Sequence, residues 1–333
     1  MPMLQGIGLP YLSWLRSTFG AALGRISTSQ FCQMYVRPFT SSSRGSLAQQ
    51  LMLRGDAAQH VGDATWFISH TWNNSFADTL DSILFFFEGQ PDAANAKVWL
   101  DVLVTSQHET AGPVRPSSFW MNKFKENIAH IGRLLLVVDA WDNPTALRRA
   151  WCAAFEMLLP YAFTTFVSRC VLELHAIAIR KQEGAGRFEV AMTVAENRRF
   201  LAGIVANHKE YYSMLGRVDA ETSDCSRAHD RQRIHEGIEC SVGFAKLNRM
   251  VFGVMESWME EQLRQQISIS LAAGCTNEAT GFSTTLAIVL HDQGRLEEAA
   301  QIRERILMSE ERGWGPDDPR VGMKIVLCWR IYA

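Results

Sequence analysis

Short apolar runs that end in polar residues constrain the fold of this chain more than any other feature. The first run ends in Ser69 and His70. The second ends in Asp101 and the third in Asp139, and segments of helix length separate the three. Apolar strands that alternate with amphipathic helices are typical of a parallel α/β sheet. Because ligands bind beyond the carboxyl ends of such strands, these side chains mark a candidate site.

The spacing of apolar residues predicts the elements around these runs. Apolar groups recur at helical intervals over 76–88, which predicts an amphipathic helix, and the turn residues at 89–92 end it. The chain then turns wholly helical over 226–266. The other predicted elements are strands over 97–103, 133–139 and 187–194, a short strand near 215–218, a helix over 119–131 and a helix pair over 279–309.

Composition limits the classes of function. A chain of 333 residues has room for one large or two modest domains with a packed core. The formal net charge is −2 and no basic run occurs, so we expect no nucleic-acid partner. No apolar stretch reaches the ~18–20 residues that cross a bilayer, so we expect no membrane span and a cytoplasmic protein.

Metal-binding patterns are weak. The seven cysteines include no C-x-x-C pair, which indicates reduced, mostly buried thiols rather than a disulfide frame or a zinc site. His70 and His108 are both expected near the sheet edge, but two histidines without a third ligand are poor evidence for zinc. We predict no metal and no resident cofactor.

The start of the chain has an unusual charge pattern. No Asp or Glu precedes Asp56, whereas five arginines do, among many Ser and Thr residues. This pattern resembles an organellar transit peptide, which gives organellar localisation as the alternative to cytoplasmic. The other interpretation is a helical lead-in to the first strand.

Four short motifs occur in a fixed order along the chain. They are FISHTW at 67–72, WLD at 99–101, SQH at 106–108 and RAWC at 149–152. Their order and residues resemble those of divergent Toll/interleukin-receptor-like (TIR-like) proteins, in which kinesin-light-chain-type TPR repeats follow the domain. The resemblance implies a flavodoxin-like parallel sheet.

The C-terminal block resembles one such TPR repeat. The helix pair over 279–309 turns at QGRLEEA, 293–299, and is followed by GPDDP at 315–319, where Asp318 stands in the place of the family's usual histidine. About three repeats are needed for a stable solenoid, so one repeat indicates a cap or a shortened array. The predicted divisions are a helical or disordered lead-in at 1–59, a TIR-like domain at 60–220, a helical connector at 221–272 and a TPR-like fragment at 273–333.

The family's W-C-x-x-E helix is interrupted in this chain. Glu156 follows Trp151 by five residues instead of four, which rotates it about 100° away from the expected face. Removing 152–169 joins Trp151 to Cys170 and places Glu173 at the family's position. Since the codons for Trp-Cys contain GT and Arg169 can be encoded by AGG, we hypothesise that 152–169 is a retained in-frame intron. The alternative is a genuine surface insertion.

The resemblance implies two main functions. Many TIR-like domains are scaffolds, so the first is a signalling protein that self-associates through its TIR-like module and binds proteins through its TPR. Some TIR domains cleave NAD⁺, so the second is an NAD⁺ glycohydrolase in which Glu173, or Glu156 as a fallback, stabilises the oxocarbenium-like transition state. NAD⁺ would then be a substrate, and a kinesin-light-chain-like cargo adaptor is a third possibility. The implied substrate-binding residues are Ser69, His70, Thr71, Trp72, Asp101, His108 and Trp151.

Overall fold

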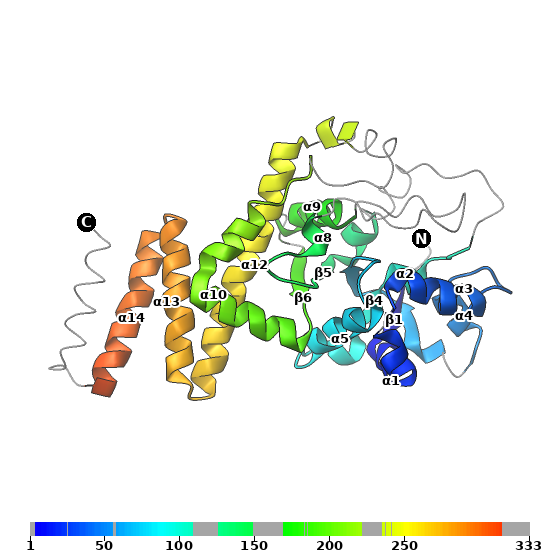
Figure 1. The fold of residues 1–333 in the computed structure, drawn as a ribbon, viewed down its shortest axis with the longest axis horizontal. Helices are drawn as coiled ribbons and strands as arrows, with labels where there is room; N and C mark the ends of the chain where they lie inside the picture. Colours follow the sequence, from blue (N-terminus) through cyan, green and yellow to red (C-terminus); the bar gives the residue numbers. More distant parts are fainter. Residues whose placement is uncertain are drawn as a thin grey trace. The chain divides into compact units, whose positions relative to one another are not determined.

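The computed structural model describes residues 4–24, 26–55, 58–108, 126–148, 169–182, 184, 186–221, 235–236, 238–240 and 242–314. These residues include a six-stranded sheet in the order β2-β1-β4-β3-β5-β6 (Figure 1). Its strands are β1 (Gln5–Gly8), β2 (Val61–Asp63), β3 (Trp66–Ser69), β4 (Lys97–Trp99), β5 (Arg133–Val137) and β6 (Arg187–Ala191).

Four neighbouring strands of this sheet, β4, β3, β5 and β6, run parallel to one another. In chain order they follow the pattern 2-1-3-4, which is compatible with a flavodoxin-like arrangement. Every residue of β3 is buried, and in β5 all but the first are buried. Strands without an exposed face have cover on both sides, as in α/β proteins. The predicted mixed α/β class with a mostly parallel sheet is confirmed.

Helices connect and cover these strands. Both α5 and α9 contact β5 and β6, and Ser75 caps the start of α5 through its hydroxyl. Residues 126–131 are also helical. The named helices of this part are α1 (Leu9–Leu23), α2 (Thr28–Phe31), the π-helix η1 (Cys32–Val36), α3 (Arg37–Phe39), α4 (Leu47–Met52), η2 (Ala58–His60), α5 (Phe76–Phe87), η3 (Ala93–Asn95), α6 (Asp101–Val104), α8 (Thr145–Arg148), α9 (Arg169–Gln182) and α10 (Val194–Leu215).

The lead-in is built into the sheet. Its strand β1 lies between β2 and β4 and is antiparallel to both. Leu12 of α1 is fully buried, and Phe31 stacks on Phe76 of α5 with ring centroids 3.9 Å apart. Ser27 and Ser46 each form a capping box, which starts α2 and α4. The prediction for this segment, a helical or disordered lead-in, did not include a strand.

Several predicted boundaries differ from the structure. The strand predicted near 215–218 is wrong, because Leu215 ends α10 and Val218 donates its amide to the Leu215 carbonyl in a turn. The strand predicted over 97–103 ends at Trp99, since the Asp101 carboxylate accepts the Val102 amide and begins α6. The strand predicted over 187–194 ends at Ala191. Of the helix predicted over 119–131, the part before residue 126 lies outside the described residues.

The chain's last described part is helical. The predicted helix pair is present as α13 (Thr276–Asp292) and α14 (Leu296–Trp314), preceded by α12 (Phe244–Ala272). Each turn contains a glycine with positive φ, 74° at Gly274 and 76° at Gly294. In both turns the amide after the glycine bonds five residues back, from Cys275 to Ser270 and from Arg295 to Leu290. These are Schellman motifs, so both helix ends are satisfied in the same way.

Packing divides the chain into two compact units. The first comprises Met1–Phe200 with Ser213–Val254, and the second comprises Leu201–Tyr212 with Met255–Ala333. In the second unit, Arg295 donates to Glu260 at 2.6 Å and to Glu298 at 2.7 Å, which ties the start of α14 to α12. Arg264 joins the same network at Glu260. The run 295–298 therefore makes a packing contact at the start of α14.

Candidate functional site

The predicted edge residues meet where β3 and β4 end. The two strands are parallel neighbours, with Phe67 opposite Trp99, so their carboxyl ends share one edge. Trp72 donates its indole N–H to Asp101 Oδ2 at 2.9 Å. His70 Nδ1 lies 4.0 Å from Asp101 Oδ1. The structure thus brings together the first-strand loop and the carboxylate that follows the second strand, as the sequence predicted.

Asp101 holds the residues at this edge in place. It is only 4% exposed, and its second oxygen, Oδ1, accepts the Val102 amide at 2.7 Å. A buried carboxylate needs such donors, because an unpaired one would pay the full cost of desolvation. Asp101 therefore holds the indole of Trp72 and starts α6 at the same time.

The SQH loop, residues 106–108, contacts the lead-in and the backbone of Asp101. The Gln107 amide nitrogen donates to the Asp101 carbonyl at 3.1 Å and to the Thr105 carbonyl at 3.0 Å. Its oxygen faces the Cys32 thiol of η1 at 3.7 Å, and burial raises the pKa of Cys32 to about 12, which keeps that thiol protonated as a donor. Ser106 donates to the Arg44 carbonyl at 2.8 Å.

His108 points to Thr40, and this contact fixes its tautomer. The Thr40 hydroxyl donates to the Val36 carbonyl at 2.7 Å and also lies 2.7 Å from His108 Nε2. Since the hydroxyl has one hydrogen, Nε2 carries the ring proton and donates to Thr40. Burial, followed by repulsion from Arg37 and Arg44, lowers the pKa of His108. Of the roles open to Asp101, orienting His108, binding a ribose hydroxyl or satisfying a loop amide, the structure shows a backbone amide, that of Val102, while His108 contacts Thr40.

Two hydroxyls at the end of β3 stand apart from this network. Ser69 and Thr71 are both buried, and within the described part of the chain neither hydroxyl has a hydrogen-bond partner. Buried polar groups are normally satisfied, so each such group calls for an explanation. A ligand hydroxyl or amide is one chemistry that would satisfy both.

Glu173 lies in the first turns of α9 and is 4% exposed. Its helix contacts β3, β5 and β6, so the glutamate belongs to the layer that packs on the sheet. Trp151 and the fallback Glu156 lie outside the described residues. In the described chain, α8 ends at Arg148, before the proposed intron, and α9 begins at Arg169, the last residue of that segment.

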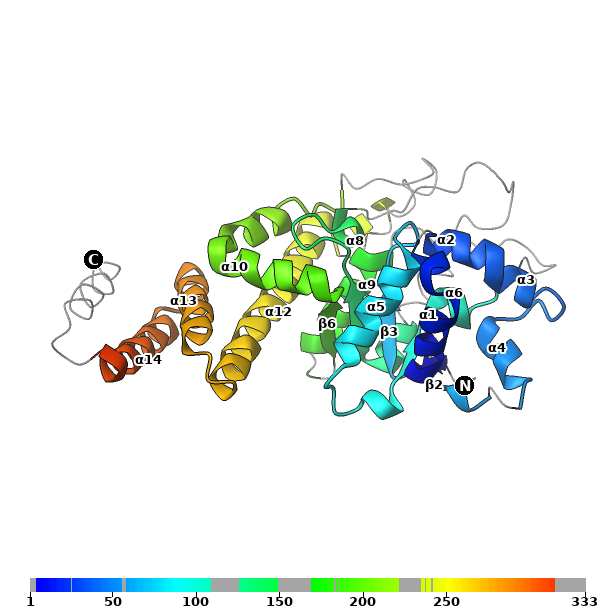
Figure 2. The same cartoon turned by 60° about the horizontal axis from the view of Figure 1, so that its bottom comes forward.

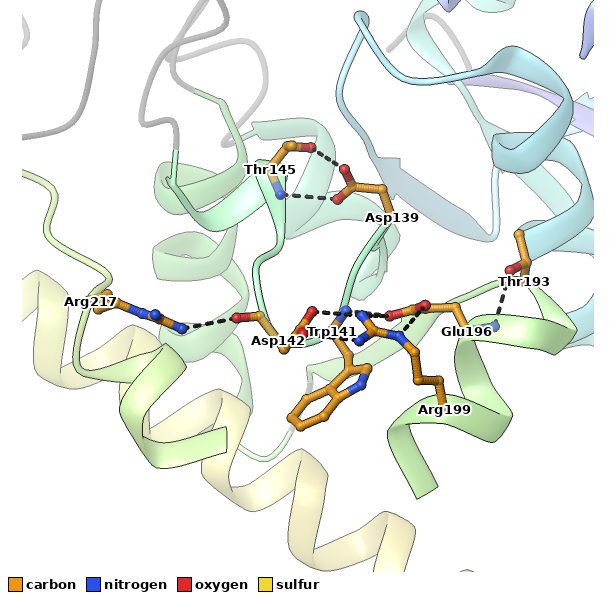
Figure 3. Close-up of polar contacts among 8 residues, drawn as sticks. All are labelled: Asp139, Trp141, Asp142, Thr145, Thr193, Glu196, Arg199 and Arg217. Atoms are coloured by element: carbon orange, nitrogen blue, oxygen red, sulfur yellow. Dashed lines mark hydrogen bonds and ion pairs between the residues drawn. The ribbon is translucent and has the colours of Figure 1, made fainter. Parts of the chain in front are cut away.

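Asp139 follows β5 and caps the next helix. Its Oδ1 and Oδ2 accept the amide and the hydroxyl of Thr145, each at 3.0 Å (Figure 3). The carboxylate is exposed, and this contact fixes the start of α8. Asp139 is thus 
placed at a strand end as predicted, with a structural role of its own.

The sequence analysis missed an ionic cluster beside Asp139. Arg199 of α10 forms a fork with Asp142, at 2.9 and 2.6 Å, and also donates to Glu196 at 2.9 Å (Figure 3). Glu196 accepts the Trp141 amide at 2.7 Å, and Arg217 donates to the Asp142 carbonyl at 3.0 Å. The Arg199 guanidinium holds the pKa of Asp142 below its ordinary value. The three-residue spacing of Glu196 and Arg199 was the only local signal for this cluster.

The described part of the chain offers neither a metal-binding cluster nor a helix suited to a bilayer. These residues contain no group of three His, Cys, Asp or Glu side chains arranged to hold a metal ion. None of their helices combines the length and apolarity needed to cross a bilayer.

No family model, no curated protein and no solved structure matches this chain. Functional inference therefore rests on the motifs at 67–72, 99–101 and 106–108 and on the geometry described above.

Proposed function

We propose that this chain is a signalling scaffold whose TIR-like α/β module self-associates and whose TPR-like helices bind other proteins. The observation that carries the proposal is that Asp101 and His108 are both engaged with groups of the protein itself. Asp101 holds Trp72 and the Val102 amide, while His108 holds Thr40. Polar groups that are bonded within the protein in this way hold loops in place and so define a surface. They are poorly placed to act on a substrate.

The helical unit supports the second half of the proposal. Schellman turns at Gly274 and Gly294 join α12 to α13 and α13 to α14. The last two helices, of 17 and 19 residues, contact each other as a hairpin. Repeat proteins stack helical hairpins in this manner and bind partners on the surface that results. The likeness to a kinesin-light-chain-type repeat points to a peptide or protein partner.

Self-association is tested by the mass of the full chain in solution. Analytical ultracentrifugation over a wide concentration range is expected to show a mass that rises with concentration. Glu173→Gln should leave that rise unchanged, because the scaffold does not depend on a catalytic carboxylate. A monomer at every concentration contradicts the scaffold proposal.

A second candidate function is NAD⁺ glycohydrolysis, and one observation favours it. Glu173 is a buried carboxylate on a helix that contacts β3, and that strand ends near two buried hydroxyls, Ser69 and Thr71, which have no partner among the described residues. A carboxylate stabilises positive charge on the ribose as nicotinamide leaves. Hydroxyls at the strand end would bind the ribose or the amide.

The enzymatic candidate predicts NAD⁺ loss at high protein concentration. Turnover should disappear in Glu173→Gln and persist in Glu304→Gln, an exposed glutamate of α14. Thermal unfolding of both variants checks that each is folded. Turnover that survives in a folded Glu173→Gln variant, or is absent from the parent chain, removes this candidate.

A further inference from the structure

A basic and apolar surface lies on the lead-in, next to the SQH loop, whose Ser106 donates to the Arg44 carbonyl. The helices α3 and α4 lie side by side in both views (Figures 1 and 2), and the Arg54 guanidinium sits 4.6 Å above the Phe39 ring. Leu53, next to Arg54, is 74% exposed. We define the basic tip as the exposed apolar and basic side chains of α3, of α4 and of the residues that follow each helix: Phe39, Arg44, Met52, Leu53 and Arg54.

Up to residue 55 the charged side chains of the lead-in have one sign. Residues 1–55 contain five arginines and neither Asp nor Glu. Arg16 is paired with Asp81 of α5, and two of the other arginines, Arg44 and Arg54, belong to the basic tip. Arg37 and Arg44 both lower the pKa of His108, as a local positive potential would.

Arg44 occupies a backbone conformation that favours glycine. Its φ is 50°, in the left-handed region, and it is the only non-glycine residue of the described chain with positive φ. A side chain there costs on the order of 1 kcal/mol relative to glycine. An exposed arginine at a strained position suggests that its charge has a use beyond the fold.

We propose that the basic tip docks on an anionic phospholipid surface. Guanidinium groups attract acidic headgroups, and apolar side chains beside them insert at the boundary of the acyl chains. This occupant accounts for both properties of the tip. Nucleic-acid phosphates would engage Arg44 and Arg54 but leave Phe39 and Leu53 in water. The proposal goes beyond the scaffold function and is independent of it.

Vesicle co-sedimentation of the full chain tests the proposal. The protein should pellet with phosphatidylcholine vesicles that contain phosphatidylserine, pellet far less with phosphatidylcholine alone, and be released by added salt. Replacing one arginine, in Arg54→Gln, should weaken binding about fivefold. Leu53→Gln should weaken it about tenfold, since the leucine no longer leaves water.

Matched controls come from exposed residues of the helical unit. Arg305→Gln and Leu271→Gln remove the same groups outside the tip and should leave vesicle binding unchanged. Arg44→Gly separates binding from folding, because it should weaken binding about fivefold while the melting temperature stays equal or rises.

Three results would overturn the proposal. The first is equal loss of vesicle binding in the tip and control variants. The second is pelleting without vesicles that depends on the tip, which would assign the surface to a second copy of the chain. The third is stronger retention on duplex DNA than on phosphatidylserine vesicles, which would assign it to nucleic acid.

Discussion

Replacing Asp101 by asparagine tests how much of the sheet edge depends on one buried carboxylate. The Asp101 carboxylate accepts hydrogen bonds from Trp72 Nε1 at 2.9 Å and from the Val102 amide at 2.7 Å. Asp139 accepts two bonds of similar length from Thr145 but is exposed. Asp139→Asn is therefore a control with matched geometry and different burial.

The expected magnitude follows from the donors. Asparagine offers one acceptor oxygen, so at Asp101 either the indole or the amide N–H faces an NH₂ group and loses its partner. An unsatisfied buried donor costs about 1–3 kcal/mol, and the charge assistance of the remaining bond is lost as well. We expect Asp101→Asn to lower the free energy of unfolding by about 2–4 kcal/mol. At Asp139 water replaces the lost acceptor, and we expect about 0.5–1 kcal/mol.

Urea denaturation followed by far-ultraviolet circular dichroism measures both losses. The dependence of the unfolding free energy on urea should stay the same in all three proteins, so that shifts in midpoint report stability. Equal losses in the two variants would refute the reasoning, because burial would then not decide the cost. A loss below about 0.5 kcal/mol at Asp101 would show that its bonds contribute little and that its oxygens are available to a ligand.

Three further predictions concern the turn glycine Gly294, the protonation of His108 and the segment 152–169. Gly294→Ala should destabilise the chain by about 1 kcal/mol, because alanine disfavours a φ of 76°, even though its Cβ would meet no atom within 4 Å. Gly281→Ala, within α13, should instead stabilise the chain by about 0.5–1 kcal/mol. Both are measured by urea denaturation. The lowered pKa of His108 means that the unfolded chain takes up this proton first, so stability falls as pH drops through the ordinary histidine value of about 6.5 towards the lowered folded value. His108→Gln should lose less stability across that window, and identical pH profiles would contradict this assignment. Transcripts should include a product without codons 152–169, and the shortened protein should be more soluble than the full chain; a single transcript that encodes the segment, or equal solubility, counts against the intron.

The parallel part of the sheet was predictable because its strands carry the signal themselves. Strands β3 and β5 are continuous apolar runs, and helical periodicity between them requires parallel crossovers. Strand β1 gave no such signal, since Gln5–Gly8 includes two glycines. A side chain at position 6 would be too close to its neighbour, because a Cβ there would lie 2.9 Å from the Ala64 Cα. Only the folded sheet brings Ala64 this close, so the sequence alone does not reveal the need for glycine.

The site was predictable at the level of position and less so at the level of contacts. Ser69, Thr71 and Asp101 lie at strand ends because strand ends follow from the apolar pattern. The partner of His108, by contrast, is Thr40, 68 residues away in the lead-in, and no local spacing encodes that pairing. The fork between Arg199 and Asp142 spans 57 residues and was missed for the same reason.

These contacts decide which variants are informative about function. Substituting Asp101 or His108 removes bonds that hold the first loop or the lead-in, so a loss of assembly or turnover in such variants mixes chemistry with folding. Glu173 differs, because the NAD⁺ hypothesis requires its charge whereas the scaffold hypothesis requires only that its helix pack on the sheet. Glu173→Gln keeps the size of the side chain and removes the charge. In a folded protein, Glu173→Gln should therefore abolish NAD⁺ turnover if the chain is an NAD⁺ glycohydrolase, and leave self-association unchanged if it is a scaffold.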